Sequence, residues 1–216
     1  MLFRFLKIIS YPVLLVFIAV NAFSLFRAGI DAAAHYRCFF GFGAGVVAYF
    51  FLRRLLRKNM DFFETFTHEL AHTIVGLLFF QRIHSFEATN GSGGMMRHSG
   101  RYSRNVFIAL APYCLPVYTY VLLVFRLVII PDFIPFFDVP VGVSFAFHAF
   151  AVKRDLSPRQ TDIKDCGILF SYLFIAAFIF FNAAIIFRTI SIGFAGAFSG
   201  WRNDFLFLFY KVSAGF

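Results

Sequence analysis

Residues 62–80 have the sequence FFETFTHELAHTIVGLLFF, an apolar run interrupted by a few ionisable side chains. These side chains are Glu64, His68, Glu69 and His72. Ionisable groups inside an apolar membrane segment are costly and are usually retained for a function. The stretch therefore predicts an apolar helix and, on the same helix, a chemical site.

The residues His68-Glu69-Leu70-Ala71-His72 form the pattern H-E-x-x-H. Positions i and i+4 share one face of a helix, so the two histidines can bind one metal ion through their ring nitrogens. Glu69 lies about 100° further round the helix, where it can accept a proton from a metal-bound water. A polar cluster that joins helices by hydrogen bonds is the alternative. The metal site is favoured because the pattern is rare by chance in a chain with six histidines.

The composition excludes a soluble protein. Of the 216 residues, 60% are hydrophobic, only 14% are charged, and 36 are phenylalanine. A soluble domain of this size has no means of burying so much apolar surface. The net charge of +9 is distributed between apolar runs, as it is in the cytoplasmic loops of membrane proteins. We therefore expect a multi-pass membrane protein in a lipid bilayer, with no nucleic-acid partner.

Several apolar runs follow one another along the chain. They cover residues 8–26, 38–52, 62–80, 105–130, 139–152 and 166–187. The pattern predicts an all-α integral membrane bundle of about six transmembrane or re-entrant helices. We interpret 139–152 as re-entrant because it is too short to cross, and 8–26 as an anchor, with a cleaved signal peptide as the alternative. Gly41, Gly43 and Gly45 favour close helix packing.

The longest polar stretch covers residues 81–104. Asn90-Gly91 and Gly93-Gly94 favour turns, and short segments at 83–88 and 95–98 flank them. The stretch predicts a small β-hairpin-like insertion after the H-E-x-x-H helix.

An H-E-x-x-H helix in such a chain resembles the site-2-protease superfamily, the M50 intramembrane zinc metallopeptidases. Residues 67–94, THELAHTIVGLLFFQRIHSFEATNGSGG, are similar to its compact M50B-like branch, in which the motif helix leads into a short strand and a glycine-rich turn. The resemblance covers roughly residues 60–185. It implies Zn²⁺ bound by two histidines and a later aspartate, with the glutamate activating water. Together with the apolar runs outside it, the resemblance predicts three parts: N-terminal transmembrane helices (1–60), a metallopeptidase membrane core (61–187) and a tail (188–216) for which an interfacial position is one interpretation.

The sequence offers several candidates for the third metal ligand. In the superfamily the aspartate usually precedes a glycine near the start of a later membrane helix, but this chain has no Asp-Gly pair. The candidates are Asp162, Asp165 and His148. We favour Asp162 because Gln160 and Thr161 can orient its carboxylate by hydrogen bonds.

Other ionisable residues have simpler interpretations. We interpret Asp155, which follows two basic residues, as a solvated charge. Glu64 lies one helical turn before His68 and is a candidate to orient that imidazole. We expect His84 and His98 to be exposed loop residues.

The basic stretches 53–58 and 153–164 adjoin the two parts of the predicted site. The positive-inside rule then favours a cytoplasmic position for this side, with the opposite orientation of the motif helix as the alternative.

The leading hypothesis is an integral-membrane zinc endopeptidase that cleaves membrane-protein substrates in or near their membrane segments, in a bacterial inner membrane. A zinc protease of the CAAX-processing type would need a later glutamate ligand, and no glutamate follows Glu87. A non-catalytic scaffold or metal-binding protein of the same fold is the remaining alternative. The presence of Glu69 argues against it, because metal binding alone does not need this residue.

Overall fold

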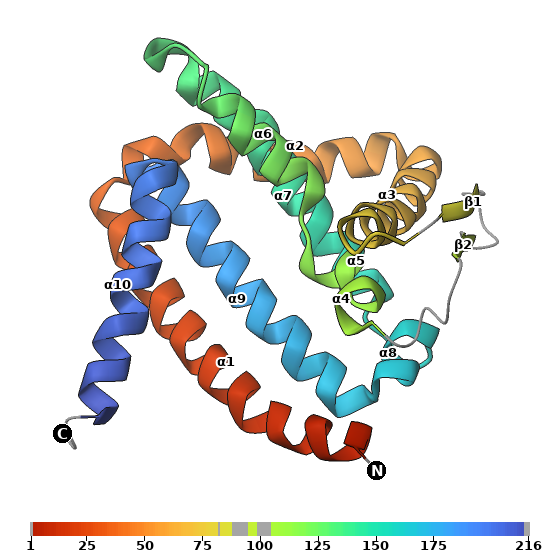
Figure 1. Ribbon diagram of the computed structural model, residues 1–216. Coiled ribbons are helices and arrows are strands. Elements are labelled where there is room, and N and C mark those ends of the chain that lie inside the picture. Colours follow the sequence, from red (N-terminus) through yellow and green to blue (C-terminus); the bar gives the residue numbers. More distant parts are fainter. Residues whose placement is uncertain (1, 82, 88–94, 99–104, 214–216) are drawn as a thin grey trace. The chain divides into compact units, whose positions relative to one another are not determined.

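The computed structural model describes residues 2–81, 83–87, 95–98 and 105–213, and these residues are almost all helical (Figure 1). The α-helices are α1 (Leu2–Ala34), α2 (Phe39–Leu55), α3 (Arg57–Leu78), α4 (Val106–Ala109), α5 (Ala111–Cys114), α6 (Val117–Arg126), α7 (Ile134–Asp155), α8 (Thr161–Cys166), α9 (Ile168–Ile192) and α10 (Phe194–Ser213). Single 3-10 turns cover Tyr36–Cys38 and Pro131–Phe133. Strands β1 (Ile83–Glu87) and β2 (Met95–His98) pair antiparallel. The helical class predicted from the apolar runs is confirmed.

Four of the described segments are long and apolar enough to cross a membrane. They are Ser10–Ala34, Tyr36–Leu55, Pro131–Asp155 and Ile168–Ile192. Their length and composition support the predicted membrane class. Among the described residues, the apolar runs at 62–80 and 105–130 contain no helix that is long and apolar enough to cross a membrane. The described residues therefore hold fewer candidate spans than the six helices predicted.

Helix α7 corrects one expectation from the sequence. The short re-entrant helix predicted at 139–152 is wrong in length, because α7 has 22 residues and is about 33 Å long. The helix continues beyond the apolar run to Lys153, Arg154 and Asp155. Arg154 pairs with Asp155, the last residue of the helix.

The apolar run at 105–130 is not one continuous helix either. It contains the short helices α4, α5 and α6, the last with 10 residues. Pro112 lies in the first turn of α5, and Pro116 immediately precedes α6. Because proline lacks a backbone N–H, it starts helices more readily than it continues them.

The chain divides into two compact units. The first consists of Met1–Phe40 and Tyr172–Phe216, and the second of Gly41–Ser171. The first unit therefore joins the beginning of the chain to its end, through α1, most of α9 and α10.

A buried arginine connects the three helices of the first unit. Arg188 of α9 is only 2% exposed. It pairs with Asp31 of α1 at 3.2 Å and with Asp204 of α10 at 2.6 Å. A charge buried among apolar helices needs such partners, because breaking a buried ion pair is strongly destabilising.

Glycines bring α2 and α7 of the second unit into backbone contact. A methyl group at Gly45 would overlap a carbonyl oxygen of α7, and one at Gly142 would overlap the carbonyl oxygen of Phe42 in α2. Gly41 makes the same kind of contact with α7, whereas Gly43 faces open space. Two of the three glycines singled out in the sequence thus form the close helix contact.

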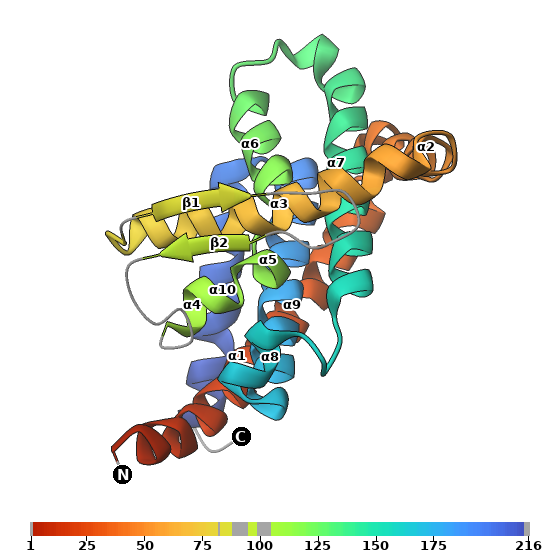
Figure 2. The ribbon, with the colours of Figure 1, turned by 90° about the vertical axis from the view of Figure 1, so that its right-hand side faces the viewer.

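Helix α3 carries the H-E-x-x-H motif and packs against α4 and α5. Strands β1 and β2 lie beside it (Figure 2), with Glu87 opposite Met95 in the antiparallel register. Residues 90–94, which are predicted to form the turn, lie outside the described residues. The motif helix therefore contacts several segments that follow it in the chain.

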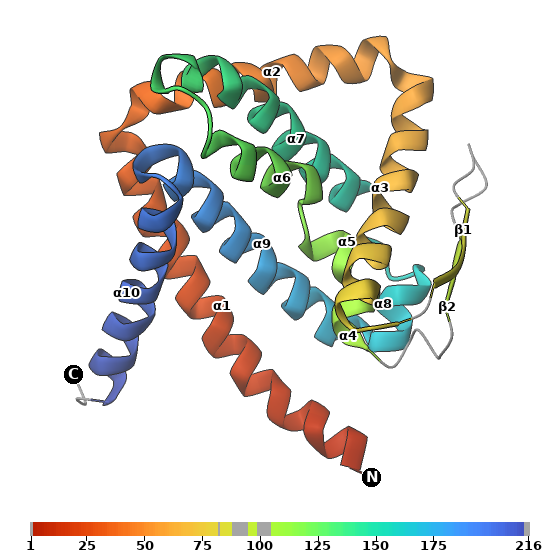
Figure 3. The same ribbon diagram turned by 45° about the horizontal axis from the view of Figure 1, so that its top comes forward.

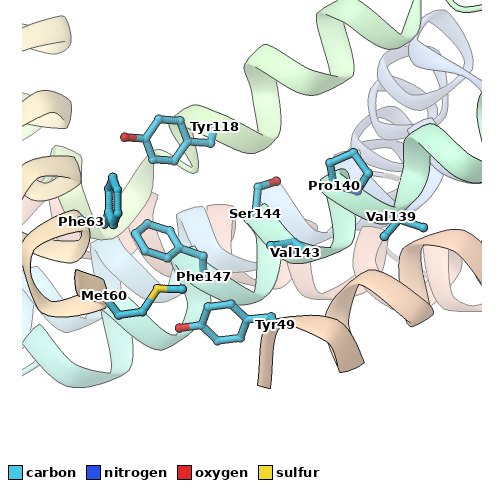
Figure 4. Close-up of a pocket in the computed structure, with 9 residues that line it drawn as sticks. All are labelled: Tyr49, Met60, Phe63, Tyr118, Val139, Pro140, Val143, Ser144 and Phe147. Carbon is cyan, nitrogen blue, oxygen red and sulfur yellow. The ribbon is translucent and has the colours of Figure 1, made fainter. Parts of the chain in front are cut away.

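An open cavity of about 590 Å³ lies between α2, α3, α6 and α7. Figure 4 shows Met60 and Phe63 of α3 facing Phe147 of α7 across it. The lining is almost wholly apolar, and among the described residues no histidine or carboxylate contributes to it. The ionisable residues of the motif lie on another part of α3, so this cavity is not the chemical site.

Candidate metal centre

The two histidines of the motif are neighbours on α3, as helical spacing requires. The ring centroids of His68 and His72 are 4.9 Å apart. His72 is only 2% exposed, and the ring of His68 packs edge-on against Tyr113 with 5.6 Å between centroids. Both imidazoles are thus held inside the protein.

Asp162 of α8 lies directly opposite the two imidazoles. Its Oδ2 atom is 3.4 Å from His68 Nε2 and 3.6 Å from His72 Nε2. One potential ligand atom from each of the three residues lies within 4.8 Å of the others. Helices α3, α4 and α8 gather at this point (Figure 3). Gly167, with φ of 90°, follows α8 and lets the chain turn into α9 without strain.

The other ring nitrogens have partners that only accept hydrogen bonds. His72 Nδ1 is 2.8 Å from the carbonyl oxygen of Ile108, so Nδ1 donates a hydrogen bond there and Nε2 is the nitrogen that faces Asp162. His68 Nδ1 lies 3.4 Å from Oδ2 of Asp155. Such contacts fix the tautomer and ring orientation of metal-binding histidines. Here they direct both Nε2 atoms towards Asp162.

The donor set fits a zinc ion. Two ligands bound at about 2 Å to a tetrahedral ion lie about 3.3 Å apart, by simple geometry. The observed N···O separations at Asp162 are 3.4 Å and 3.6 Å. Two imidazole nitrogens and one carboxylate oxygen also leave a fourth position for water or substrate, as in catalytic zinc sites.

Glu69 lies beside this group without belonging to it. The residue is 7% exposed, and its carboxylate is near enough to both imidazoles and to Asp162 to interact with them electrostatically. Burial raises the pKa of Glu69 above its ordinary value, against the opposing effect of the two histidines. A raised pKa suits a carboxylate that must take up a proton near neutral pH.

Asp162 has the opposite electrostatic balance. Burial favours its neutral form, but hydrogen bonds and charge interactions with His68 and His72 outweigh burial and hold the pKa of Asp162 below its ordinary value. The carboxylate is therefore ionised at neutral pH, which is the form that a metal ligand requires.

The other predicted candidates lie elsewhere. Asp165 is exposed, and neither it nor His148 belongs to the group formed by His68, His72 and Asp162. His84 and His98, expected in a loop, lie instead in strands β1 and β2, and their side chains lie outside what the structure describes.

Two carboxylates have roles other than those expected. Glu64 does not contact His68; it is completely buried and accepts hydrogen bonds from Arg53 and Arg154. Asp155, interpreted from the sequence as a solvated charge, contacts His68 instead. No local signal in the sequence indicates this, because the contact joins α3 to the end of α7.

Apolar helices of membrane-spanning length and a largely buried His–His–Asp group define a class, a membrane protein with a candidate metal centre. The protein-family model described as Peptidase M50B-like matches residues 42–206, which is most of the chain. The match includes His68, His72 and Asp162. The chain belongs to this family, as the motif helix indicated, and the family points to a membrane peptidase. Searches of curated proteins and of solved structures found no match.

Proposed function

We propose that this protein is an integral-membrane zinc endopeptidase that hydrolyses peptide bonds in or near membrane segments of partner proteins. The observation that carries the proposal is the convergence of Asp162 on His68 and His72, with Glu69 beside them. Membership of a peptidase family and the four candidate membrane spans support it.

In this proposal His68, His72 and Asp162 hold the metal. When bound, zinc supplies a Lewis acid that polarises the scissile carbonyl and makes water more acidic. Glu69 accepts a proton from the attacking water. The water oxygen bonds to the carbonyl carbon, and Glu69 delivers this proton to the amide nitrogen as the C–N bond breaks, so that a carboxylic acid and an amine result.

The partner is a membrane protein that must unfold locally before cleavage, because a helix keeps its amides in internal hydrogen bonds. Strands β1 and β2 lie beside α3, and a strand edge there can pair with an extended substrate. We expect the protein to act in the bacterial inner membrane.

A scaffold or metal carrier of the same fold is the second candidate function. Nothing in the site favours it, since Glu69 is not one of the three grouped ligands and metal storage has no need of a buried carboxylate next to them.

Comparison of cell membranes tests the proposal even before a substrate is identified. Cells producing the wild-type protein or the variant E69Q are compared by mass spectrometry of protein N-termini. We expect new termini, in or close to membrane segments, only with the wild type. The same termini in both samples would overturn the assignment.

A further inference from the structure

The two histidines of the metal centre are oriented by different means. His72 donates its second nitrogen to a backbone carbonyl, that of Ile108, at 2.8 Å. The second nitrogen of His68 faces a side chain, the carboxylate of Asp155, at 3.4 Å. The orientation of His68 therefore depends on a residue that can be replaced, whereas that of His72 depends on the main chain.

Asp155 is itself held in place. It is the last residue of α7, and Arg154 donates to both of its carboxylate oxygens, from Nε at 2.7 Å and from Nη2 at 3.1 Å. This paired arrangement fixes the plane of the carboxylate. The Asp155 side chain is only 13% exposed, so water competes little for these contacts.

The arginine is anchored in turn by a buried carboxylate. Glu64 accepts hydrogen bonds from Arg154 and from Arg53 and has no exposed surface. Glu64 lies one helical turn before His68 on α3. With Asp155 included, two arginines face two carboxylates at the junction of α2, α3 and α7.

We propose that Asp155 is a positioning residue for His68, and that Arg154, fixed by Glu64 and Arg53, holds Asp155 in the required place. This inference rests on the proposed metal-dependent function and adds residues that touch neither metal nor substrate. A carboxylate on the outer nitrogen of a metal-binding histidine sets its tautomer and raises its basicity. The junction of three helices thereby sets the geometry of one ligand.

Zinc affinity tests the proposal without any protease assay. The full chain is purified in detergent, and its affinity for zinc is measured by competition with a chelating dye. We expect D155A to weaken zinc binding by about 10- to 100-fold and D155N by less, because amide oxygen still accepts a hydrogen bond. D165A and D165N remove an exposed carboxylate from the neighbouring segment and should bind zinc like the wild type.

The spectrum of the Co²⁺-loaded protein separates positioning from a loss of folding. Visible absorption bands of cobalt report the ligand geometry, and far-UV circular dichroism reports helix content. We expect altered bands in D155N with unchanged helicity. Should D155A fail to fold, D155N decides the question. Wild-type affinity and wild-type bands in D155N would overturn the proposal, whether or not the protein cleaves any substrate.

A double-mutant cycle tests the part assigned to Arg154. If Arg154 acts through Asp155, the single variant R154Q should weaken zinc binding. Adding R154Q to D155N should then change the zinc affinity little. Additive losses would overturn this part. A wild-type protein that binds zinc tightly but cleaves nothing would instead contradict the proposed function and leave the positioning of His68 intact.

Discussion

The carboxylate of Asp162 lies 3.4 Å from Nε2 of His68, although 94 positions separate the two residues in the sequence. This contact adds a third potential ligand to a two-histidine motif. It also distinguishes Asp162 from Asp165, which is in the same short helix but is exposed.

The first prediction concerns this third ligand. D162N should lower the zinc content of the purified protein from about one equivalent to a small fraction, because a tetrahedral hydrolytic site needs three protein ligands. D165N makes the same chemical change three residues later and should leave zinc content unchanged. Metal analysis by mass spectrometry measures the zinc content of both variants. If D162N keeps its zinc and D165N loses it, Asp165 and not Asp162 is the third ligand.

A second prediction separates the proton-transferring residue from the ligands. E69Q should keep its zinc and its helicity but lose at least about 100-fold in turnover, as expected for removal of a general base. Turnover is measured on a substrate identified by the comparison of membranes. Cleavage by E69Q at the wild-type rate would refute the proton-transfer role. Loss of zinc in E69Q would show instead that Glu69 supports the metal directly.

Metal removal provides a third test. Since zinc binds the folded state, zinc at 100 times its dissociation constant should stabilise the wild type by about 2.7 kcal/mol. A chelator should abolish this gain along with cleavage, and added zinc should restore both. H72A, which lacks one ligand, should show little change in thermal unfolding on addition of zinc. If zinc raises the unfolding temperature of H72A as much as that of the wild type, the zinc binds at another site.

The fourth prediction concerns the contact between α2 and α7. G142A should lower the free energy of unfolding by about 1–3 kcal/mol or more, because the added methyl group overlaps the backbone of α2. Gly43 faces open space, so G43A should leave the free energy of unfolding unchanged or raise it by up to about 1 kcal/mol, since alanine favours helix more than glycine does. Unfolding in detergent measures both, and equal effects would argue against the tight helix contact.

The local features of the site could be predicted because they depend on helix geometry alone. The spacing of His68 and His72 places them on one face of any helix, and their ring centroids are indeed 4.9 Å apart. The ends of the membrane segments were harder to predict. Apolar runs define them poorly where charges are paired, as at Arg154 and Asp155, or where prolines divide a run, as at Pro112.

The sequence by itself determined the membrane class, the helical architecture and the motif, since each follows from composition or from the helical period. Only the tertiary structure decided which carboxylates meet the motif. Asp162 reaches both imidazoles, Asp155 reaches the outer nitrogen of His68, and Glu64 is directed towards two arginines instead. The physical reason is that helical periodicity fixes neighbours within one helix, whereas contacts among α3, α7 and α8 depend on how separate helices pack.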